Sequence, residues 1–152
     1  MTTRPGTVHR AHWTDLDPTT LHDLLRLRID VFVVEQKCAY PELDGRDLEP
    51  GTEHLWITDA CGPASYLRVL TEPDGARRVG RVCTRGNARG RGLAARLLDA
   101  VLAGWPQARL VLDAQTYVAG FYAARGFAVS GPEFVEDGIP HVPMVRDPGP
   151  PA

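Results

Sequence analysis

The sequence predicts an α/β (α+β) fold built on a mixed central sheet of about six to seven strands. Short β-branched and apolar runs alternate with stretches in which apolar residues recur every three or four positions. Residues 77–105 combine a strand, a glycine- and arginine-rich turn and a helix, and a further apolar run follows them, as in a parallel crossover. The 152 residues suffice for one domain, 1–152, with residues 147–152 as a flexible tail.

Composition excludes several functional classes. The net charge is −2, so bulk charge implies neither a nucleic acid nor an anionic membrane as partner. Cys38, Cys61 and Cys83 are irregularly spaced, which fits a reduced, intracellular protein. The N-terminal MTTRPGTVHR lacks the apolar core of a secretion signal, and no apolar run is long enough to span a membrane. We therefore expect a cytoplasmic protein.

The N-terminal third predicts a strand, a helix and a long loop. Residues 8–13 form the strand, and Asp17 with Pro18 starts a helix that runs to about Val34. Residues 35–51 contain two prolines, two glycines and five acids, which breaks the helical period. Loops of this length are often functional, and the alternative interpretation is a solvated acidic surface.

Three strands are predicted next, at residues 54–59, 64–71 and 77–84, as an antiparallel meander. Gly80 in the third strand predicts a bulge or a close approach by another backbone.

The last third predicts a strand at residues 109–114 that is covered on both faces, because its central residues are continuously apolar. A short helix is expected at 118–125, and two strands at 127–130 and 139–146 flank a loop, PEFVEDG.

The turn before the central helix predicts an anion site. Gly86, Gly90 and Gly92 let the backbone curl around another molecule, and the helix begins near Gly92. Its first N–H groups are unpaired at the positive end of the helix dipole, which suits a phosphate. Arg89 and Arg91 add two cations whose geometry matches phosphate oxygens. We therefore expect a phosphate-bearing cofactor.

Three motifs use such a turn. The P-loop form requires a lysine that this turn lacks. The dinucleotide form G-x-G-x-x-G/A is matched by residues 90–95, but roughly half the chain precedes them, whereas dinucleotide folds place this turn after the first strand. The third form, Arg-x-x-Gly-x-Ala at residues 89–94, resembles motif A of the GNAT N-acetyltransferases, where it holds the pyrophosphate of coenzyme A.

Further motifs extend this resemblance over about residues 7–146. Residues 121–127, F-Y-x-x-x-G-F, are similar to motif B of the family. Residues 31–40, Ala114-Gln115 and residues 136–141 resemble the ElaA-type branch. The resemblance implies the GNAT fold, with helices on both faces of a sheet that splays between its fourth and fifth strands.

The resemblance also implies acetyl-CoA as co-substrate and assigns residues to it. The backbone of Val82, Cys83 and Thr84 would pair with pantetheine like an added strand. The pyrophosphate would lie on Arg89, Gly90, Arg91, Gly92, Leu93, Ala94 and Ala95. Tyr122 aligns with the tyrosine that protonates the leaving thiolate in many relatives. Gln115 stands where many relatives have asparagine, which leaves its cofactor contact open.

Transfer to an amine also needs a neutral amine and an oxyanion site. An N–H near Val82 or Cys83 can supply the oxyanion site. Candidates for the base are Glu35, His54, Glu136, Asp137 and His141. Of these we select Glu35 and His141 as residues lining the acceptor site. Cys83 is interpreted as a small buried apolar residue, and no metal site is expected.

We predict an acetyl-CoA-dependent N-acetyltransferase that acts on a primary amine of a small molecule or a protein. The acidic residues of 35–49 suggest an acceptor that carries positive charge. No nucleic acid or membrane partner is expected, and a homodimer is left open. Two alternatives remain: a non-catalytic acyl-CoA-binding or sensing module on the same fold, and a nicotinamide-binding oxidoreductase.

Overall fold

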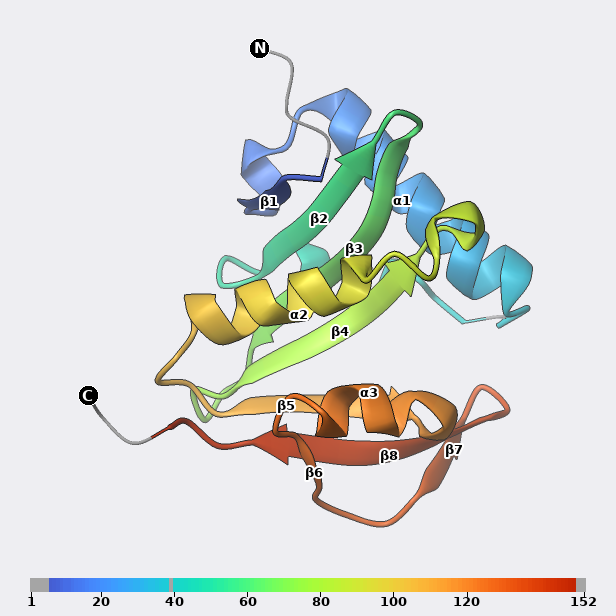
Figure 1. The fold of residues 1–152 in the computed structure, drawn as a ribbon. Helices are drawn as coiled ribbons and strands as arrows, with labels where there is room; N and C mark the ends of the chain where they lie inside the picture. Colours follow the sequence, from blue (N-terminus) through green and yellow to red (C-terminus); the bar gives the residue numbers. More distant parts are fainter. Residues whose placement is uncertain (1–5, 39, 150–152) are drawn as a thin grey trace.

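The computed structural model describes residues 6–38 and 40–149. Ala39 of the ElaA-like stretch and the end of the predicted tail lie outside the described residues. One eight-stranded sheet runs in the order β1-β2-β3-β4-β5-β8-β6, and β7 pairs with β8 (Figure 1). Its strands are β1 (Val8–Ala11), β2 (Glu53–Asp59), β3 (Gly62–Thr71), β4 (Arg77–Thr84), β5 (Leu110–Gln115), β6 (Ala128–Val129), β7 (Phe134–Glu136) and β8 (Ile139–Arg146).

The helices cover both faces of the sheet, as the resemblance implied (Figure 1). Three are α-helices: α1 (Pro18–Arg28), α2 (Leu93–Gly104) and α3 (Ala119–Ala123). A π-helix, η2 (Ile29–Glu35), continues α1. The short 3₁₀ turns are η1 (Trp13–Asp15), η3 (Arg46–Leu48), η4 (Gly86–Ala88) and η5 (Thr116–Val118). Among the described residues, none of the helices combines the length and apolar character needed to cross a membrane.

Each face of the sheet has its own hydrophobic core. On the α2 face, Leu97, Leu98 and Val101 of α2 pack with Tyr122 of α3 against the sheet. On the α1 face, the cluster of apolar side chains from α1, η2 and the sheet is smaller, and consists of Leu24, Leu27, Val31, Phe32, Trp56, Tyr66 and Cys83. We use "α1 face" and "α2 face" for these two sides below.

The first helix begins where the sequence predicts and then changes its winding. The Asp17 carboxylate accepts a hydrogen bond of 2.8 Å from the Thr20 N–H, which caps α1. The helical path reaches Glu35, close to the predicted end, but residues 29–35 form the wider π-helix η2. Such single wide turns are frequent at functional sites. This turn buries Val31 and Phe32 and brings Glu35 to the end of β4.

β4 and β5 form a parallel pair in which only two residue pairs are in register, Arg77 with Leu110 and Arg78 with Val111. The predicted splay between the fourth and fifth strands is therefore confirmed. Next to Gly80, β4 places two residues, Arg81 and Val82, opposite one residue of β3. This is the predicted bulge, and Arg81 adopts a positive φ of 52° within it.

Two predictions for the C-terminal third are wrong. The expected loop PEFVEDG contains the strand β7, closed onto β8 by the turn Asp137-Gly138, whose two residues both have positive φ. An Asp-Gly pair between apolar residues is itself a hairpin signal. β5 is covered on one face only, because Leu112 is buried whereas Asp113 is exposed. The short helix predicted at 118–125 is present as α3, which spans Ala119–Ala123 and follows the 3₁₀ turn η5.

The acids of loop 35–51 form a solvated surface only in part, because all of them are ion-paired and two, Glu42 and Asp47, are buried. Arg28 is fully buried, and its guanidinium donates to Glu42 at 2.7 Å and to Asp47 at 2.9 Å. Arg68 of β3 binds the same Asp47 at 3.1 Å and Asp44 at 2.6 Å. Removing one partner of such a buried pair leaves an uncompensated charge, so the pairs fix the loop against the sheet. These acids are neutralised, and the basis for expecting a positively charged acceptor fails with them.

His54 extends this network into the core. Its Nε2 donates to the Asp47 carbonyl at 3.4 Å, so its Nδ1 accepts the hydrogen bond of 2.6 Å from the Tyr66 hydroxyl. Burial lowers the pKa of His54 from 6.5 to about 4. Protonation would remove the acceptor for Tyr66 and place a cation near Arg28.

This pKa shift predicts acid sensitivity. Between pH 6.5 and about 4 the unfolded chain binds a proton at His54 that the folded chain refuses, so stability falls as pH falls through this window. At about 1.4 kcal/mol per pKa unit, the loss is about 3 kcal/mol. Urea unfolding of the wild type and of His54→Gln at pH 7 and pH 4.5 measures it. The glutamine amide can make both hydrogen bonds without titrating, so the variant should lose less unfolding free energy between pH 7 and pH 4.5 than the wild type. Equal losses in the two proteins would contradict the assignment of the acid sensitivity to His54.

Candidate active site

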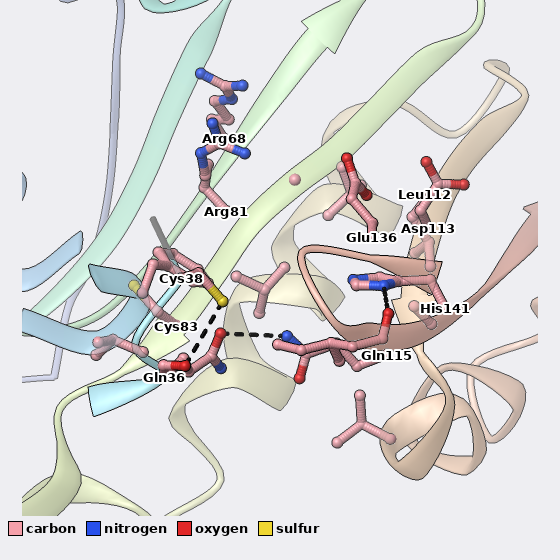
Figure 2. A pocket seen from close by; sticks show the side chains of 18 of the residues that line it. Gln36, Cys38, Arg68, Arg81, Cys83, Leu112, Asp113, Gln115, Glu136 and His141 are labelled. Carbon is pink, nitrogen blue, oxygen red and sulfur yellow. Dashed lines mark hydrogen bonds between the residues drawn. The ribbon is translucent and has the colours of Figure 1, made fainter. Parts of the chain in front are cut away.

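A cavity of about 1090 Å³ occupies the opening between β4 and β5 (Figure 2). Its walls come from both halves of the splayed sheet, from η2, from α3 and from the β7–β8 turn. The predicted site residues that line it are Glu35, Val82, Cys83, Thr84, Arg89, Ala94, Gln115, Tyr122 and His141. The structure thus brings together residues that are far apart in the sequence.

The glycine turn forms a second, smaller hollow at the N-terminus of α2. This hollow of about 190 Å³ is lined by Thr84, Ala88, Arg89, Gly90, Gly92, Leu93, Ala94, Ala95 and Phe121. Gly92 is the N-cap residue with φ 71°, a conformation that favours glycine, and no side chain caps the helix. The first N–H groups of α2 therefore remain available at the positive end of the helix dipole, as predicted for a phosphate seat.

The two arginines of the turn are already engaged by protein groups. Arg89 donates to both carboxylate oxygens of Glu35, and its Nε donates to the Thr84 carbonyl at 3.1 Å. Arg91 lies 3.7 Å from the Asp59 carboxylate and donates to the Asn87 carbonyl. Backbone amides, rather than uncommitted cations, are thus the groups that this turn offers to an anion.

Glu35 lines the cavity but is a poor base. The hydrogen bonds from Arg89 lower the pKa of its carboxyl. A carboxylate held in this way accepts a proton from an ammonium group only weakly. The pairing argues against the predicted catalytic role and gives Glu35 another one, which is to connect η2 to the phosphate turn.

Val82, Cys83 and Thr84 line the cavity from the end of β4. Beyond Arg78 this strand has no registered partner on its β5 side, so an extended molecule could pair with it. Cys83 is buried, and burial raises the pKa of its thiol well above the usual range. A thiol that stays protonated is a weak nucleophile, which supports its interpretation as a buried apolar residue.

Tyr122 is held by the core of the α2 face and lines the cavity. Its ring packs edge-on against Phe121 and Phe127, with centroids 5.0 and 6.0 Å away. Burial raises the pKa of its phenol to about 12. The hydroxyl therefore remains protonated at neutral pH and can donate into the cavity.

His141 of β8 also lines the cavity and has an available nitrogen. Its Nδ1 lies 2.7 Å from the Ile139 carbonyl, which can only accept, so Nδ1 carries the proton. Nε2 of the neutral ring then has a lone pair for a proton. The ring stacks on Phe134 at 5.7 Å, and β8 pairs His141 with Gln115 beside the opening. His54, in contrast, is buried in the charge network.

Sequence reasoning missed a contact that spans the opening. The Gln115 Nε2 donates to the Gln36 Oε1 at 3.3 Å and so joins β5 to the end of η2 (Figure 2). Gln36 lies within the ElaA-like stretch, which was the available signal. Among the residues that the structure describes, no group of three or more His, Cys, Asp or Glu side chains could hold a metal ion.

Sequence comparisons place the chain among acetyltransferases. The acetyltransferase (GNAT) domain family matches residues 26–147. A UPF0039 protein of Mycobacterium tuberculosis is 50% identical over 136 residues, which cover 87% of each chain. The protein ElaA of Escherichia coli is 36% identical over 144 residues, which cover 90% of this chain and 93% of ElaA.

Solved structures agree. The crystal structure of an acyl-CoA N-acyltransferase from Pseudomonas aeruginosa has a TM-score of 0.87 and 36% identity, covering 93% of this chain and 99% of that one. The crystal structure of Escherichia coli ElaA gives a TM-score of 0.87 at 32% identity with the same coverage. The chain therefore belongs to the GNAT acetyltransferase family, in its ElaA-type branch.

Proposed function

We propose that this GNAT-family acyltransferase transfers the acetyl group of acetyl-CoA directly to a primary amine. The observation that carries the proposal is the opening between β4 and β5, whose cavity is lined by both Tyr122 and His141. The phosphate seat at α2 lies at the end of β4, so a pyrophosphate there would direct its pantetheine arm along the unpaired edge of the strand.

The residues around the opening can support each step of the transfer. His141 Nε2 takes a proton from the acceptor ammonium, and the neutral nitrogen attacks the thioester carbonyl carbon. The bulge at Arg81 and Val82 departs from regular pairing with β3, so backbone N–H groups there can bind the developing oxyanion. When the carbon–sulfur bond breaks, the Tyr122 hydroxyl protonates the departing thiolate. The nitrogen loses its second proton as the amide forms, and this proton restores the Tyr122 hydroxyl.

The alternatives fit the structure less well. A dinucleotide-binding oxidoreductase needs a largely parallel sheet, whereas here β4 and β5 are the one parallel pair among the described strands. A non-catalytic acyl-CoA sensor on the same fold would bind the cofactor in the same opening. It would not require a protonated phenol at the opening, nor an imidazole with an available nitrogen. Turnover of an amine separates the sensor from the enzyme.

The variant Tyr122→Phe tests whether Tyr122 is the general acid that protonates the thiolate. Removing only the hydroxyl should lower kcat by about 100-fold, because general acids contribute roughly 10²–10⁴-fold, while the Kd for acetyl-CoA stays nearly unchanged. Steady-state thiol release and calorimetric titration give the two numbers.

Tyr117→Phe is the matched control, because Tyr117 also lines the cavity but is 75% exposed on the neighbouring turn η5. Its kcat should match the wild type. Equal kcat for Tyr122→Phe and the wild type across several amines would remove the acid role.

The variant His141→Ala tests whether His141 is the general base that deprotonates the acceptor amine. At pH 7 the variant should lose about 100-fold in kcat/KM for the amine. The deficit should shrink toward pH 10, because a primary amine with a pKa of about 10 then loses its proton to water. Initial rates from pH 6.5 to 10 measure this convergence.

The exposed His22 of α1 provides the control variant, His22→Ala, with the wild-type profile expected. A deficit for His141→Ala that is constant across the pH range would assign His141 to binding instead of proton transfer.

A further inference from the structure

Part of the cavity wall has no side chain, because the residue of β4 at that point is a glycine. Gly80 of β4 pairs with Arg68 of β3 and lines the cavity. Arg68 is two residues from Tyr66, which packs in the cluster on the α1 face, so both paired residues face that side. A Cβ built on Gly80 would meet no atom within 4 Å, and the φ of Gly80 lies outside the left-handed region. Neither backbone geometry nor protein packing therefore requires glycine here, and the space above it is available to a ligand.

Opposite charges flank this space. Figure 2 shows Arg68 and Arg81 on one side of the cavity, and Asp113, Glu136 and His141 on the other. Among the described residues, Glu136 has no ion-pair partner, and Asp113 is paired with Arg78 at 3.4 Å. The cavity thus has a guanidinium wall on β3 and β4 and a carboxylate–imidazole wall on β5 and the β7–β8 hairpin.

The guanidinium wall retains donors that the protein does not satisfy. Arg81 Nη1 donates to no protein group among the described residues, and the Arg81 side chain is 20% exposed. Arg68 is buried and already bound to Asp44 and Asp47. The rest of the Arg81 guanidinium is engaged by the protein. Its Nε lies 3.0 Å from Glu42 Oε2, and its Nη2 donates to the Glu42 carbonyl at 3.3 Å and to Asp44 at 3.5 Å. A ligand in the cavity can therefore bring an acceptor atom to Arg81 Nη1, whereas the Nε atoms of Arg68 and Arg81 are buried away from the cavity.

We propose that the seat above Gly80 takes a small zwitterion, an amine that carries its own carboxylate, as in an amino acid. The carboxylate binds Arg81 at its accessible Nη1, and the ammonium faces His141 and Glu136. This inference rests on the proposed acetyl transfer and specifies its acceptor. A diamine, or any other amine without a carboxylate, would lack the charged hydrogen bond to Arg81 Nη1.

The chemical step is the transfer described above. The nitrogen–carbon bond forms and the carbon–sulfur bond breaks. His141 takes one proton from the ammonium, Tyr122 gives its proton to the sulfur, and the second proton that the nitrogen loses as the amide forms returns to Tyr122. The carboxylate takes no part in it. Held by the guanidinium wall, it orients the amine, and its contacts should lower KM for the acceptor.

Matched pairs of substrates test the proposal. The wild type is assayed with acetyl-CoA and a panel of α-, β- and γ-amino acids, each beside its own carboxamide, together with diamines. At least one amino acid should exceed its carboxamide in kcat/KM by about tenfold or more, the effect of one charged hydrogen bond. Carboxamides or diamines turned over equally well would overturn the zwitterion and leave the proposed function intact. Absence of turnover with every amine would overturn both.

Variants of Arg81 test whether this residue binds the carboxylate of the acceptor. Arg81→Gln should bring the carboxylate-to-carboxamide ratio close to one, and Arg81→Lys, which keeps the charge, should retain part of it. A defect in folding alone would lower kcat/KM equally for the amino acid and its carboxamide, and the ratio would not change. An unchanged ratio in a variant that melts like the wild type would overturn the assignment of Arg81.

A Gly80 series tests the seat without altering charge. Gly80→Ala and Gly80→Leu fill the space stepwise, so KM for the acceptor should rise in that order while the Kd for acetyl-CoA stays constant. Gly149→Leu, also in open space but away from the cavity, is the control and should behave as the wild type. A constant acceptor KM across the series would place the acceptor elsewhere.

Discussion

The short parallel contact between β4 and β5 is the constraint on which the rest of the structure depends. Two registered pairs join the strands at one end, and beyond them the strands separate. A strand edge inside a domain carries unpaired N–H and C=O groups, which proteins normally cover. Here the edge faces a cavity. Arg89 binds the Thr84 carbonyl and Glu35, and so ties the end of β4 to η2 beside the opening.

The acceptor side is shaped by buried charge rather than by apolar packing. Arg28, Arg68, Asp47 and Glu42 form ion pairs that fix loop 35–51 against the sheet. Buried ion pairs often add little net stability, but they disfavour alternative arrangements because each misplaced partner leaves a bare charge. In this protein they place the loop as one wall of the cavity. Beside this network, Arg81 keeps one accessible nitrogen, Nη1, without a protein partner among the described residues, so the same wall can serve recognition as well as support.

Much of the fold could be predicted because local signals and motif order agree. β4 and β8 have the predicted bounds, and α2 begins after Gly92 as the glycine turn indicates. The π-helix could not be foreseen, because its apolar residues follow the same spacing as an α-helix. The ion pairing of the acids in loop 35–51 could not be predicted either, because their partners are arginines far away in the sequence, such as Arg68. For the same reason, Glu35 looked available as a base until Arg89 was placed beside it.

Amide hydrogen exchange with and without acetyl-CoA tests the central claim most directly, because it reports on the unpaired edge of β4 itself. The account predicts slower exchange on binding in residues 79–84 and 90–95, with little change in β1 and β2. Protection confined to other segments, or binding without protection of β4, would contradict a cofactor that lies in the opening between β4 and β5.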